Sequence, residues 1–423
     1  MLRRLGGLLA AVVLSGCLAA PASPTAPPRA VTATFSAPTA PPTRAATPGS
    51  QHLVIWLPPE FAPEAAQPGG AVLAEHLAQF EAGHPGWTVQ ARVKAADGPS
   101  GLLAALLAAH NVAPAALPDL IALRADDLAA AAAAGAVVAL DRWVPREALE
   151  DSYPFARAMG LTQNQWAGLA FAADARILVY NTDLYATAPT HWADIVTGTM
   201  SLPAAEATGL SVLTDYLAAG GQVLDEAGQP ALEAPRLAAS LAEWRRLQER
   251  GVLPLSTLTY TGPEESWQVF RERRVTLTLT TAHWYLTEAG RVSLAAAALP
   301  PNQTGAPFTL AEGWCWALVN KGEDLAGAAE LLNWLASPAR QAAWTLAAGW
   351  LPTRAATLTA WGEAPFVPLA AEALTRAQWE PPPRVRDLVG PLLRQAVADV
   401  LNGRATPEAA ARTVVAALAA LPK

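Results

Sequence analysis

The residues that could carry out chemistry are few and far apart. The chain holds neither an HExxH nor a CxxC motif, so its histidines and cysteines do not indicate a metal site. No GxSxG motif follows a predicted strand, which argues against a Ser-His-Asp hydrolase. No GxGxxG or GxxxxGKS/T motif opens a helix, which argues against nucleotide binding. We therefore expect no metal and no cofactor. The six histidines are His52, His76, His84, His110, His191 and His283.

Carboxylates are the remaining route to catalysis. The pairs Asp126-Asp127 and Glu264-Glu265, together with Asp324, could supply the two acids that a glycosidase needs. Neighbouring acidic residues, however, usually lie on a solvated surface. We expect a binding protein rather than an enzyme, and an exported glycan-acting enzyme stays open as an alternative.

The two cysteines stand in different surroundings. Cys17 follows two arginines, the apolar run 5–14 and two small residues, which is the pattern of the bacterial lipoprotein box. The run is about half the ~20 residues that a transmembrane helix needs. We expect a lipoprotein signal peptide over 1–16 and a lipid anchor on Cys17; the alternative is an ordinary secretory signal. Cys315 lies in an apolar run and is expected to be a core residue.

Composition indicates an exported, tethered body. Residues 17–50 are rich in Pro, Ala and Thr, which favours an extended, solvated tether. The net charge of −7 argues against nucleic acid as a partner. The chain has 15 Trp against 6 Tyr and 8 Phe, an excess that fits sugar recognition but also a large core. We expect a monomer held on the extracytoplasmic face of the cell membrane.

Strands and helices alternate along the body. Short apolar or alternating runs at 52–57, 87–93 and 119–123 predict strands, and apolar residues at helical spacing predict helices between them. Such βαβ units indicate a parallel sheet and an α/β fold. Further strands are predicted at 176–180, 275–279 and 314–319, and a helix at 237–247 that Gly251 ends. Ser337-Pro338 and Thr406-Pro407 are typical of helix starts.

The order of motifs over almost the whole body resembles the extracellular solute-binding proteins of ABC importers, in the maltose-type family 1. The resemblance is distributed over many short runs rather than concentrated in one. The runs are LPDLI at 117–121, AGAVVALD at 134–141, QWAGLAF at 165–171, VYNTDL at 179–184, WADI at 192–195, FRERR at 270–274, GW at 313–314, LASP at 335–338 and GWLPTR at 349–354.

The resemblance implies a two-lobed, periplasmic-binding-protein-like fold of type II, with the ligand in the cleft between the lobes. The first lobe would comprise 51–171 and 298–336, and the second 172–297 and 337–423. The implied function is capture of a small solute, a sugar or oligosaccharide in the first place, and delivery to a membrane permease. A solute of another class, such as a polyol phosphate, a polyamine or a peptide, stays open.

The resemblance also implies site residues, one position at a time. Asp174 matches an acidic position that accepts hydrogen bonds from sugar hydroxyls, and Trp284 matches a tryptophan that stacks on sugar. Other positions match loops or segments that border the cleft, although each tryptophan could equally be core and Arg354 could simply pair with a carboxylate. These positions are Glu60, Arg124, Asp126, Trp314, Trp350 and Arg354.

The chain departs from the family pattern at three positions. Leu123 stands where maltodextrin binders have an aromatic residue, Gly390 where another cleft tryptophan would fall, and Ala170 where a proline is usual. The stacking set for maltodextrin is therefore incomplete. The transport role is expected, while the sequence leaves the identity of the solute, its affinity and the partner permease open.

Overall fold

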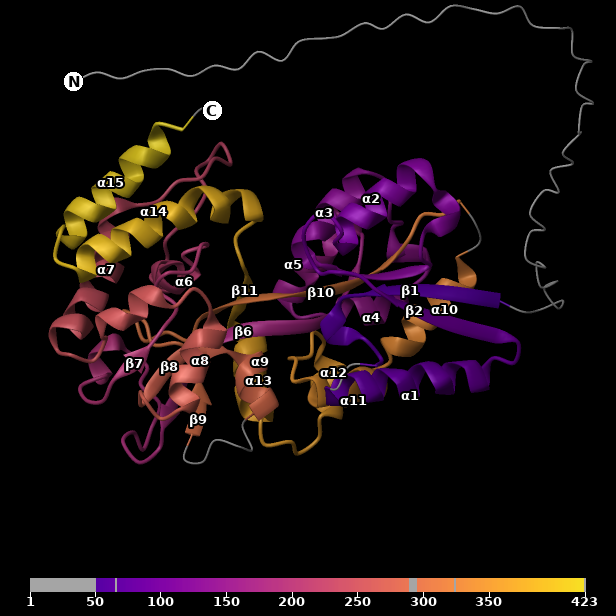
Figure 1. Ribbon diagram of the computed structural model, residues 1–423, viewed down its shortest axis with the longest axis horizontal. Helices are drawn as coiled ribbons and strands as arrows, with labels where there is room; N and C mark the ends of the chain where they lie inside the picture. The colour runs from indigo at the N-terminus through magenta and orange to yellow at the C-terminus, as the bar shows by residue number, and fades with distance from the viewer. Residues whose placement is uncertain (1–50, 65–66, 289–294, 323–324, 422–423) are drawn as a thin grey trace, which may run out of the picture. The chain divides into compact units, whose positions relative to one another are not determined.

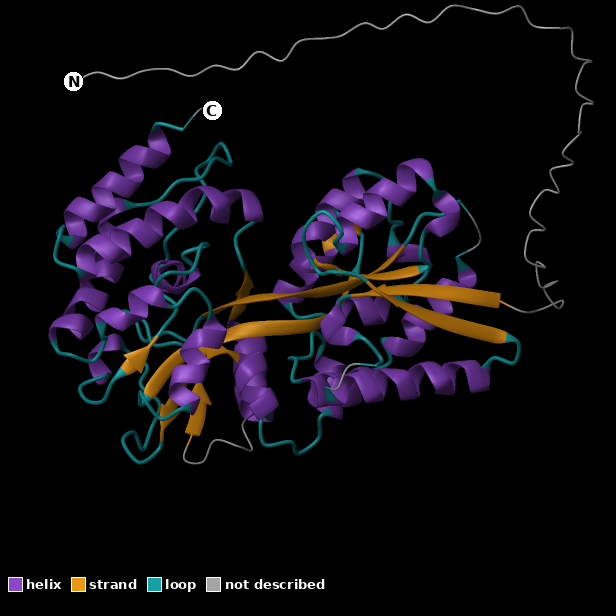
Figure 2. Ribbon diagram, viewed as in Figure 1, coloured by secondary structure: helices purple, strands orange, loops and turns teal. Residues whose placement is uncertain are grey.

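The computed structural model describes residues 51–64, 67–288, 295–322 and 325–421. In this part of the chain, helices cover the strands on both sides (Figures 1 and 2). The strands are β1 (Gln51–Leu57), β2 (Trp87–Val93), β3 (Leu120–Arg124), β4 (Leu161–Thr162), β5 (Gln165–Trp166), β6 (Leu169–Asn181), β7 (Met200–Ser201), β8 (Leu277–Thr281), β9 (Ala295–Ala298), β10 (Thr309–Leu318) and β11 (Ala377–Trp379). The helices are α1 (Pro68–Gly83), α2 (Leu102–Val112), α3 (Ala125–Ala133), α4 (Arg146–Glu150), α5 (Pro154–Gly160), α6 (Leu210–Ala218), α7 (Ala234–Glu249), α8 (Pro263–Arg271), α9 (Ala282–Glu288), α10 (Ala326–Leu335), α11 (Pro338–Ala348), α12 (Ala355–Ala360), α13 (Val367–Arg376), α14 (Pro383–Leu401) and α15 (Pro407–Ala419). None of the helices in the described ranges is long and apolar enough to cross a membrane.

Several elements begin and end where local chemistry predicts. The apolar run after Gln51 forms β1, whose last five residues are buried. Helix α7 ends just before Gly251, which has a φ of +75°, a left-handed conformation that glycine adopts without steric cost. At the start of α15 the Thr406 hydroxyl accepts a hydrogen bond from the Ala409 N–H at 3.2 Å. These predicted elements are confirmed.

The main sheet has the strand order β2-β1-β3-β10-β6-β8-β7, with β11 paired to β10 and β9 paired to β6. Strands β2, β1 and β3 are parallel, as the βαβ pattern predicts. The prediction of a parallel sheet is wrong for the centre, where β10 runs antiparallel to both β3 and β6. The reason is topological: β10 returns from the other half of the molecule instead of following a local βαβ crossover.

Strand β6 connects the two halves of the sheet. Its first part, 169–175, pairs with β10, and its second part, 176–181, pairs with β8 and β9. Strand β11 adds to the start of β10. Figure 1 shows β6, β10 and β11 running between the halves, so these three strands form the connection, which we call the hinge strands.

The hydrophobic core divides into two clusters. The first includes residues of β1, β3 and α3, and the second includes residues of β7, α6, α7, α14 and α15. Helix α11 packs on α1, and Trp344 and Leu374 join the first cluster. The predicted lobe boundary at 336–337 stays a prediction, because the first cluster also contains Trp267 and Ala282 of the predicted second lobe.

Candidate functional site

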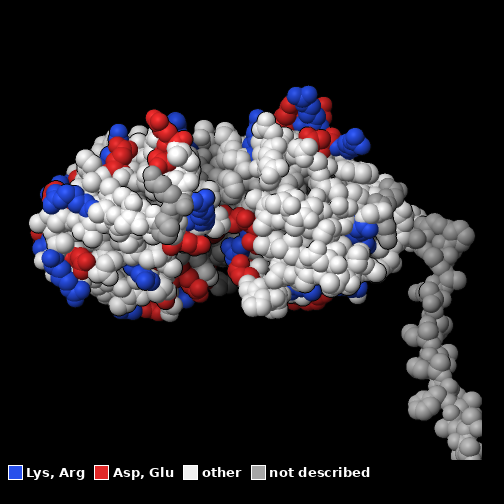
Figure 3. All heavy atoms as spheres, turned by 90° about the horizontal axis from the view of Figure 1, so that it is seen from above, with Lys and Arg blue, Asp and Glu red and all other residues white. Residues whose placement is uncertain are grey.

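A cavity of about 290 Å³ opens beside the hinge strands. Asp174 and Arg176 of β6 and Leu310 and Glu312 of β10 face it, because side chains two positions apart on a strand point to the same side. Figure 3 shows acidic and basic side chains gathered where the two halves meet. The rest of the lining comprises Ala175, Glu206, Ala207, Thr208, Leu210, Thr261, Pro263, Thr281, Glu380 and Arg386.

Arg176 joins the hinge to the loop before α6. Its Nη2 donates to Glu206 Oε2 at 2.8 Å, and its Nη1 donates to Oε1 of the same carboxylate at 3.4 Å. Nη1 also donates to Ser211 Oγ at 3.3 Å, while the Ser211 backbone N–H donates to Glu206. The carboxylate thus lies at the N-terminus of α6, where negative charge is favoured. These contacts hold the loop in place over the cavity.

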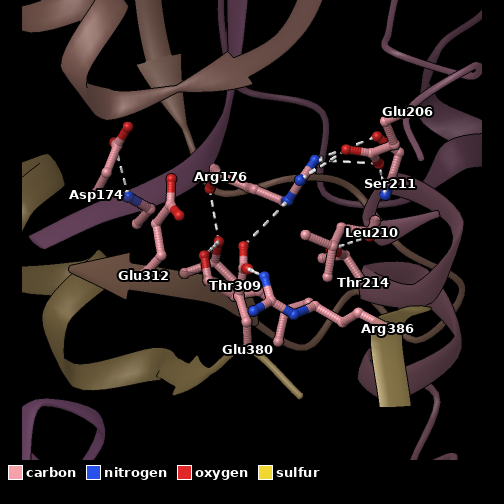
Figure 4. Close-up of polar contacts among 12 residues, drawn as sticks. Asp174, Arg176, Glu206, Leu210, Ser211, Thr214, Thr309, Glu312, Glu380 and Arg386 are labelled. Carbon is pink, nitrogen blue, oxygen red and sulfur yellow. Dashed lines mark hydrogen bonds and ion pairs between the residues drawn. The ribbon is translucent and has the colours of Figure 1, made fainter. Parts of the chain in front are cut away.

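Arg386 connects the two core clusters. It lies in the first turn of α14, and its Nη1 donates to Glu380 Oε2 at 2.8 Å. Its Nη2 donates to the carboxylate of Asp126, in the first turn of α3. Glu380 also lies 4.0 Å from Arg176 Nε. The ion pairs therefore form a continuous series from Asp126 of α3 to Glu206, just before α6. Figure 4 shows the part of this series around Glu380.

Two carboxylates lie directly opposite each other on the cavity floor. Asp174 and Glu312 are register partners in the antiparallel pair of β6 and β10, and both line the cavity (Figure 4). Asp174 accepts hydrogen bonds from the backbone N–H groups of Ala175 and His283, at 2.8 and 2.9 Å. Glu312 lies 3.7 Å from Arg124 Nη1. Like charges opposite each other in a sheet are unfavourable, so this pair needs an explanation.

Burial makes the carboxylates of the site hard to ionise. It raises the pKa of Asp174 to about 6, and the Glu312 carboxyl acts in the same direction. Burial raises the pKa of Glu380 to about 8, again with a contribution from Glu312. The pKa of Asp126 is also raised by burial, against the effect of Arg386. Perturbed carboxylates in a cavity are typical of functional sites.

Three predicted site residues come together here. Asp174 lines the cavity, Asp126 pairs with Arg386, and Arg124 lies beside Glu312. Trp314 is close to them but only 2% exposed: its ring lies under Arg124, 5.0 Å from the guanidinium carbon, and contacts Phe61 edge-on at 5.1 Å. The structure thus brings the predicted acidic and basic residues together and leaves the tryptophan largely covered.

The other predicted residues lie outside the cavity lining. Trp284 and Trp350 are half-buried, and both rings contact His283, with centroids 5.6 and 4.7 Å away. Glu60 is exposed on the short 3-10 helix η1 (Pro59–Phe61). Arg354 is 2% exposed and donates to the Gln341 side chain and the Ala336 carbonyl, which accounts for its burial. Their roles in binding stay predictions.

Sequence reasoning missed five charged residues that line the cavity. The available signal was a charge within an apolar strand: Arg176 interrupts the run LAFAADARILVY, and Glu312 interrupts TLAEGWCW. A charged residue is rarely buried without a partner, so each one predicted a partner that local patterns could not identify. The five are Arg176, Glu206, Glu312, Glu380 and Arg386.

The structure also describes some of the residues that were considered for nucleophilic, metal or acid chemistry. Cys315 is buried and burial raises the pKa of its thiol to about 12, which confirms it as a core residue. Among the described residues, no group of three or more His, Cys, Asp and Glu could hold a metal ion. Cys17 and Asp324 lie outside the described residues.

Comparisons with known proteins identify the family. A model for bacterial extracellular solute-binding proteins matches residues 75–365, which is more than half of the chain. A search of curated proteins returns no match. Among solved structures, a cyclic α-maltosyl-1,6-maltose binding protein from Arthrobacter globiformis is 18% identical with a TM-score of 0.71, and the match covers 88% of this chain and 98% of that one.

Two further structures support the same fold. The sugar-binding protein MalE from Xanthomonas citri is 19% identical, with a TM-score of 0.71 over 87% of this chain and 98% of that one. A solute-binding protein of an ABC transporter from Agrobacterium radiobacter K84, in complex with ribitol, is 22% identical, with a TM-score of 0.62 over 86% and 97%. These likenesses confirm the predicted two-lobed α/β fold. The chain belongs to the bacterial extracellular solute-binding proteins, the family that supplies ABC importers with their solutes.

Proposed function

We propose that the chain binds a small carbohydrate in the cavity beside the hinge strands and delivers it to an ABC permease. The observation that carries this proposal is the cavity itself, which has a volume of about 290 Å³ and is lined by polar side chains of the hinge strands and of the half that holds α6 and α14. Sites for small ligands typically start at about 300 Å³ and combine enclosure with a few oriented polar groups. The volume suits a small solute better than a long polymer.

The polar groups suit a polyhydroxyl ligand. Carboxylates such as Asp174 accept hydrogen bonds from hydroxyls, and guanidinium groups such as that of Arg386 donate to their oxygens. The structurally similar proteins named above include binders of a cyclic maltosyl-maltose and of ribitol, which supports the choice of a carbohydrate or polyol. Closure of the lobes around the solute would exclude water and strengthen each contact.

Binding without turnover is part of the proposal. A panel of mono- and disaccharides should contain one that raises the melting temperature and changes tryptophan fluorescence, while chromatography finds the sugar unchanged. If no carbohydrate in the panel has an effect and a phosphate or peptide does, the carbohydrate proposal fails. A cleaved glycan in the chromatogram would instead identify an enzyme.

We further propose that the protein is exported as a monomer and anchored by lipid at Cys17. The basic start, the apolar run 5–14 and the following tether support this. A Cys17→Ser variant should lose membrane association and incorporate no labelled fatty acid, and globomycin should block processing of the wild-type chain. Acylation of Cys17→Ser, or processing that ignores globomycin, would contradict the anchor.

A further inference from the structure

The charges around the cavity are not evenly matched. Glu206 pairs with Arg176, and Glu380 and Asp126 share Arg386. Asp174 and Glu312 remain, facing each other in register across β6 and β10. Asp174 accepts hydrogen bonds from two backbone N–H groups, and the His283 ring and the Thr281 side chain lower its pKa against the larger effect of burial. The excess negative charge of the floor is therefore concentrated between these two carboxyl groups.

The cation beside Glu312 does not neutralise the pair. Arg124 Nη1 lies 3.7 Å from Glu312, but its Nε lies 3.4 Å from Asp97, and its guanidinium rests on the Trp314 ring. Arg124 is thus shared between two carboxylates and held by an aromatic ring. The side chain of Glu312 is 46% exposed, so a solute entering the cavity can reach it.

A second observation points to a missing ligand at the same place. Arg386 lines the cavity and is only 8% exposed, yet its Nε has no acceptor among the described residues. Thr281, also 8% exposed, does not count as a second free donor, because its side chain already lowers the pKa of the neighbouring Asp174 carboxyl group. Buried polar groups are nearly always hydrogen-bonded, so Arg386 Nε lacks an acceptor that a solute oxygen can supply.

We infer that the solute carries a protonated amino group, which binds between Asp174 and Glu312. The inference rests on the proposed function and narrows it from carbohydrates in general to amine-bearing sugars or polyols. An ammonium group offers three donors, enough for both carboxylates, and an oxygen of the solute can accept from Arg386 Nε. A protonated amine also removes the repulsion that an empty cavity leaves in place.

The same arrangement disfavours anionic solutes. Besides Glu380, which burial makes hard to ionise, three carboxylates line the cavity, against two guanidinium groups whose Nη atoms are already engaged. A phosphorylated polyol would therefore meet mostly negative charge. Of the alternatives that the sequence leaves open, the polyol phosphate is the one that this cavity fits worst.

Matched ligands test the inference directly. Binding of D-glucosamine, D-glucose and N-acetyl-D-glucosamine, and of the corresponding galactose series, is measured by calorimetry and thermal shift at pH 7, with putrescine as an amine that is not a sugar. We expect one amino sugar to bind at least about tenfold more tightly than its hydroxyl and N-acetyl partners, because only the amine makes charge-assisted bonds to both carboxylates.

Each other outcome separates the inference from the proposed function. Neutral sugars that bind as tightly as amino sugars overturn the inference and leave the carbohydrate function standing. Binding of putrescine without any sugar supports the ammonium site and overturns the carbohydrate function. No response to any amine overturns the inference, whether or not a neutral sugar binds.

Two variants test whether the amino group of the solute binds to Asp174 and Glu312. Glu312→Gln, at a half-buried position, should fold normally and reduce the preference for the amino sugar about tenfold, while Asp174→Asn keeps the acceptor oxygen and should reduce it similarly. Glu372→Gln, on the exposed face of α13, is the matched control and should leave the preference unchanged. An unaltered preference in Glu312→Gln contradicts the inference even if Asp174→Asn fails to fold.

Discussion

Two groups of side chains lie on or beside the hinge strands, and they differ in whether they pack against one another or line the cavity. The aromatic group comprises Phe61, Phe171, Trp314, Trp344 and Trp350. The charged group comprises Asp174, Arg176, Glu312, Glu380 and Arg386. The aromatic rings mostly cover one another, with Phe61 at the centre at 1% exposure, whereas every member of the charged group lines the cavity.

From this difference we propose which group contacts a solute. A ring stacks on a sugar only if one of its faces is free, and edge-to-face contacts with other rings occupy the faces in the aromatic group. The charged group is open to the cavity and is imperfectly neutralised by itself. We therefore assign stability mainly to the aromatic group and selectivity mainly to the charged group, and the following experiments test that division.

The largest effect is expected from the centre of the aromatic group. Phe61→Ala removes a buried ring that contacts four others, and it should lower the free energy of unfolding by about 4 kcal/mol. Urea unfolding measures this loss. Glu64→Ala, an exposed position just after the same 3-10 helix, should stay within about 0.5 kcal/mol of wild type. If Phe61→Ala is as stable as wild type but no longer binds sugar, the aromatic group serves binding rather than stability, and our assignment is wrong.

The next effect concerns the ion pairs between the core clusters. Arg386→Met leaves Glu380 and Asp126 without their shared partner and should lower the free energy of unfolding by about 3 kcal/mol. Adding Glu380→Gln should recover part of the loss, because it replaces a buried ionisable group that has lost its partner with a neutral amide. The exposed Arg384→Met on the same helix is the control. If the single and double variants lose the same free energy of unfolding, the Arg386–Glu380 ion pair contributes only through packing.

How much of this could be predicted from the sequence depends on the range of the interactions. Elements such as β1 and α15 follow from neighbouring residues, so their patterns predicted them well. The opposition of Asp174 and Glu312 depends on the register between two strands far apart in the sequence, which no local pattern encodes. The family resemblance supplied the position of Trp314, but its exposure depends on how the surrounding rings pack.

A smaller effect is expected from the titration of Asp174. Its pKa in the folded protein is about 6, against an ordinary value of 3.8, so the folded state binds more protons than the unfolded state between those values. The free energy of unfolding should therefore fall as the pH rises, by about 2 kcal/mol between pH 4 and pH 6 from this group alone. Asp174→Asn should lack that contribution.

The readout is the difference between the two unfolding curves against pH. Taking the difference removes the contribution of groups that titrate in both proteins, such as Glu380, whose pKa is raised to about 8. A saturating amino sugar should flatten the wild-type slope, because an ammonium group stabilises the ionised carboxylate. Parallel curves for wild type and Asp174→Asn would show that Asp174 is already ionised at pH 4.

The smallest effect separates stacking from charge recognition. The family resemblance assigns a stacking role to Trp284, whereas the structure places this half-buried ring against His283, whose backbone N–H donates to Asp174. Through that indirect contact, Trp284→Ala should weaken solute binding about fivefold, or about 1 kcal/mol, with the preference for an amine retained. Calorimetry on Trp284→Ala and Glu312→Gln compares the two roles. If Trp284→Ala abolishes binding of amino and neutral sugars alike, while Glu312→Gln binds normally, stacking governs recognition and the charged group serves stability instead.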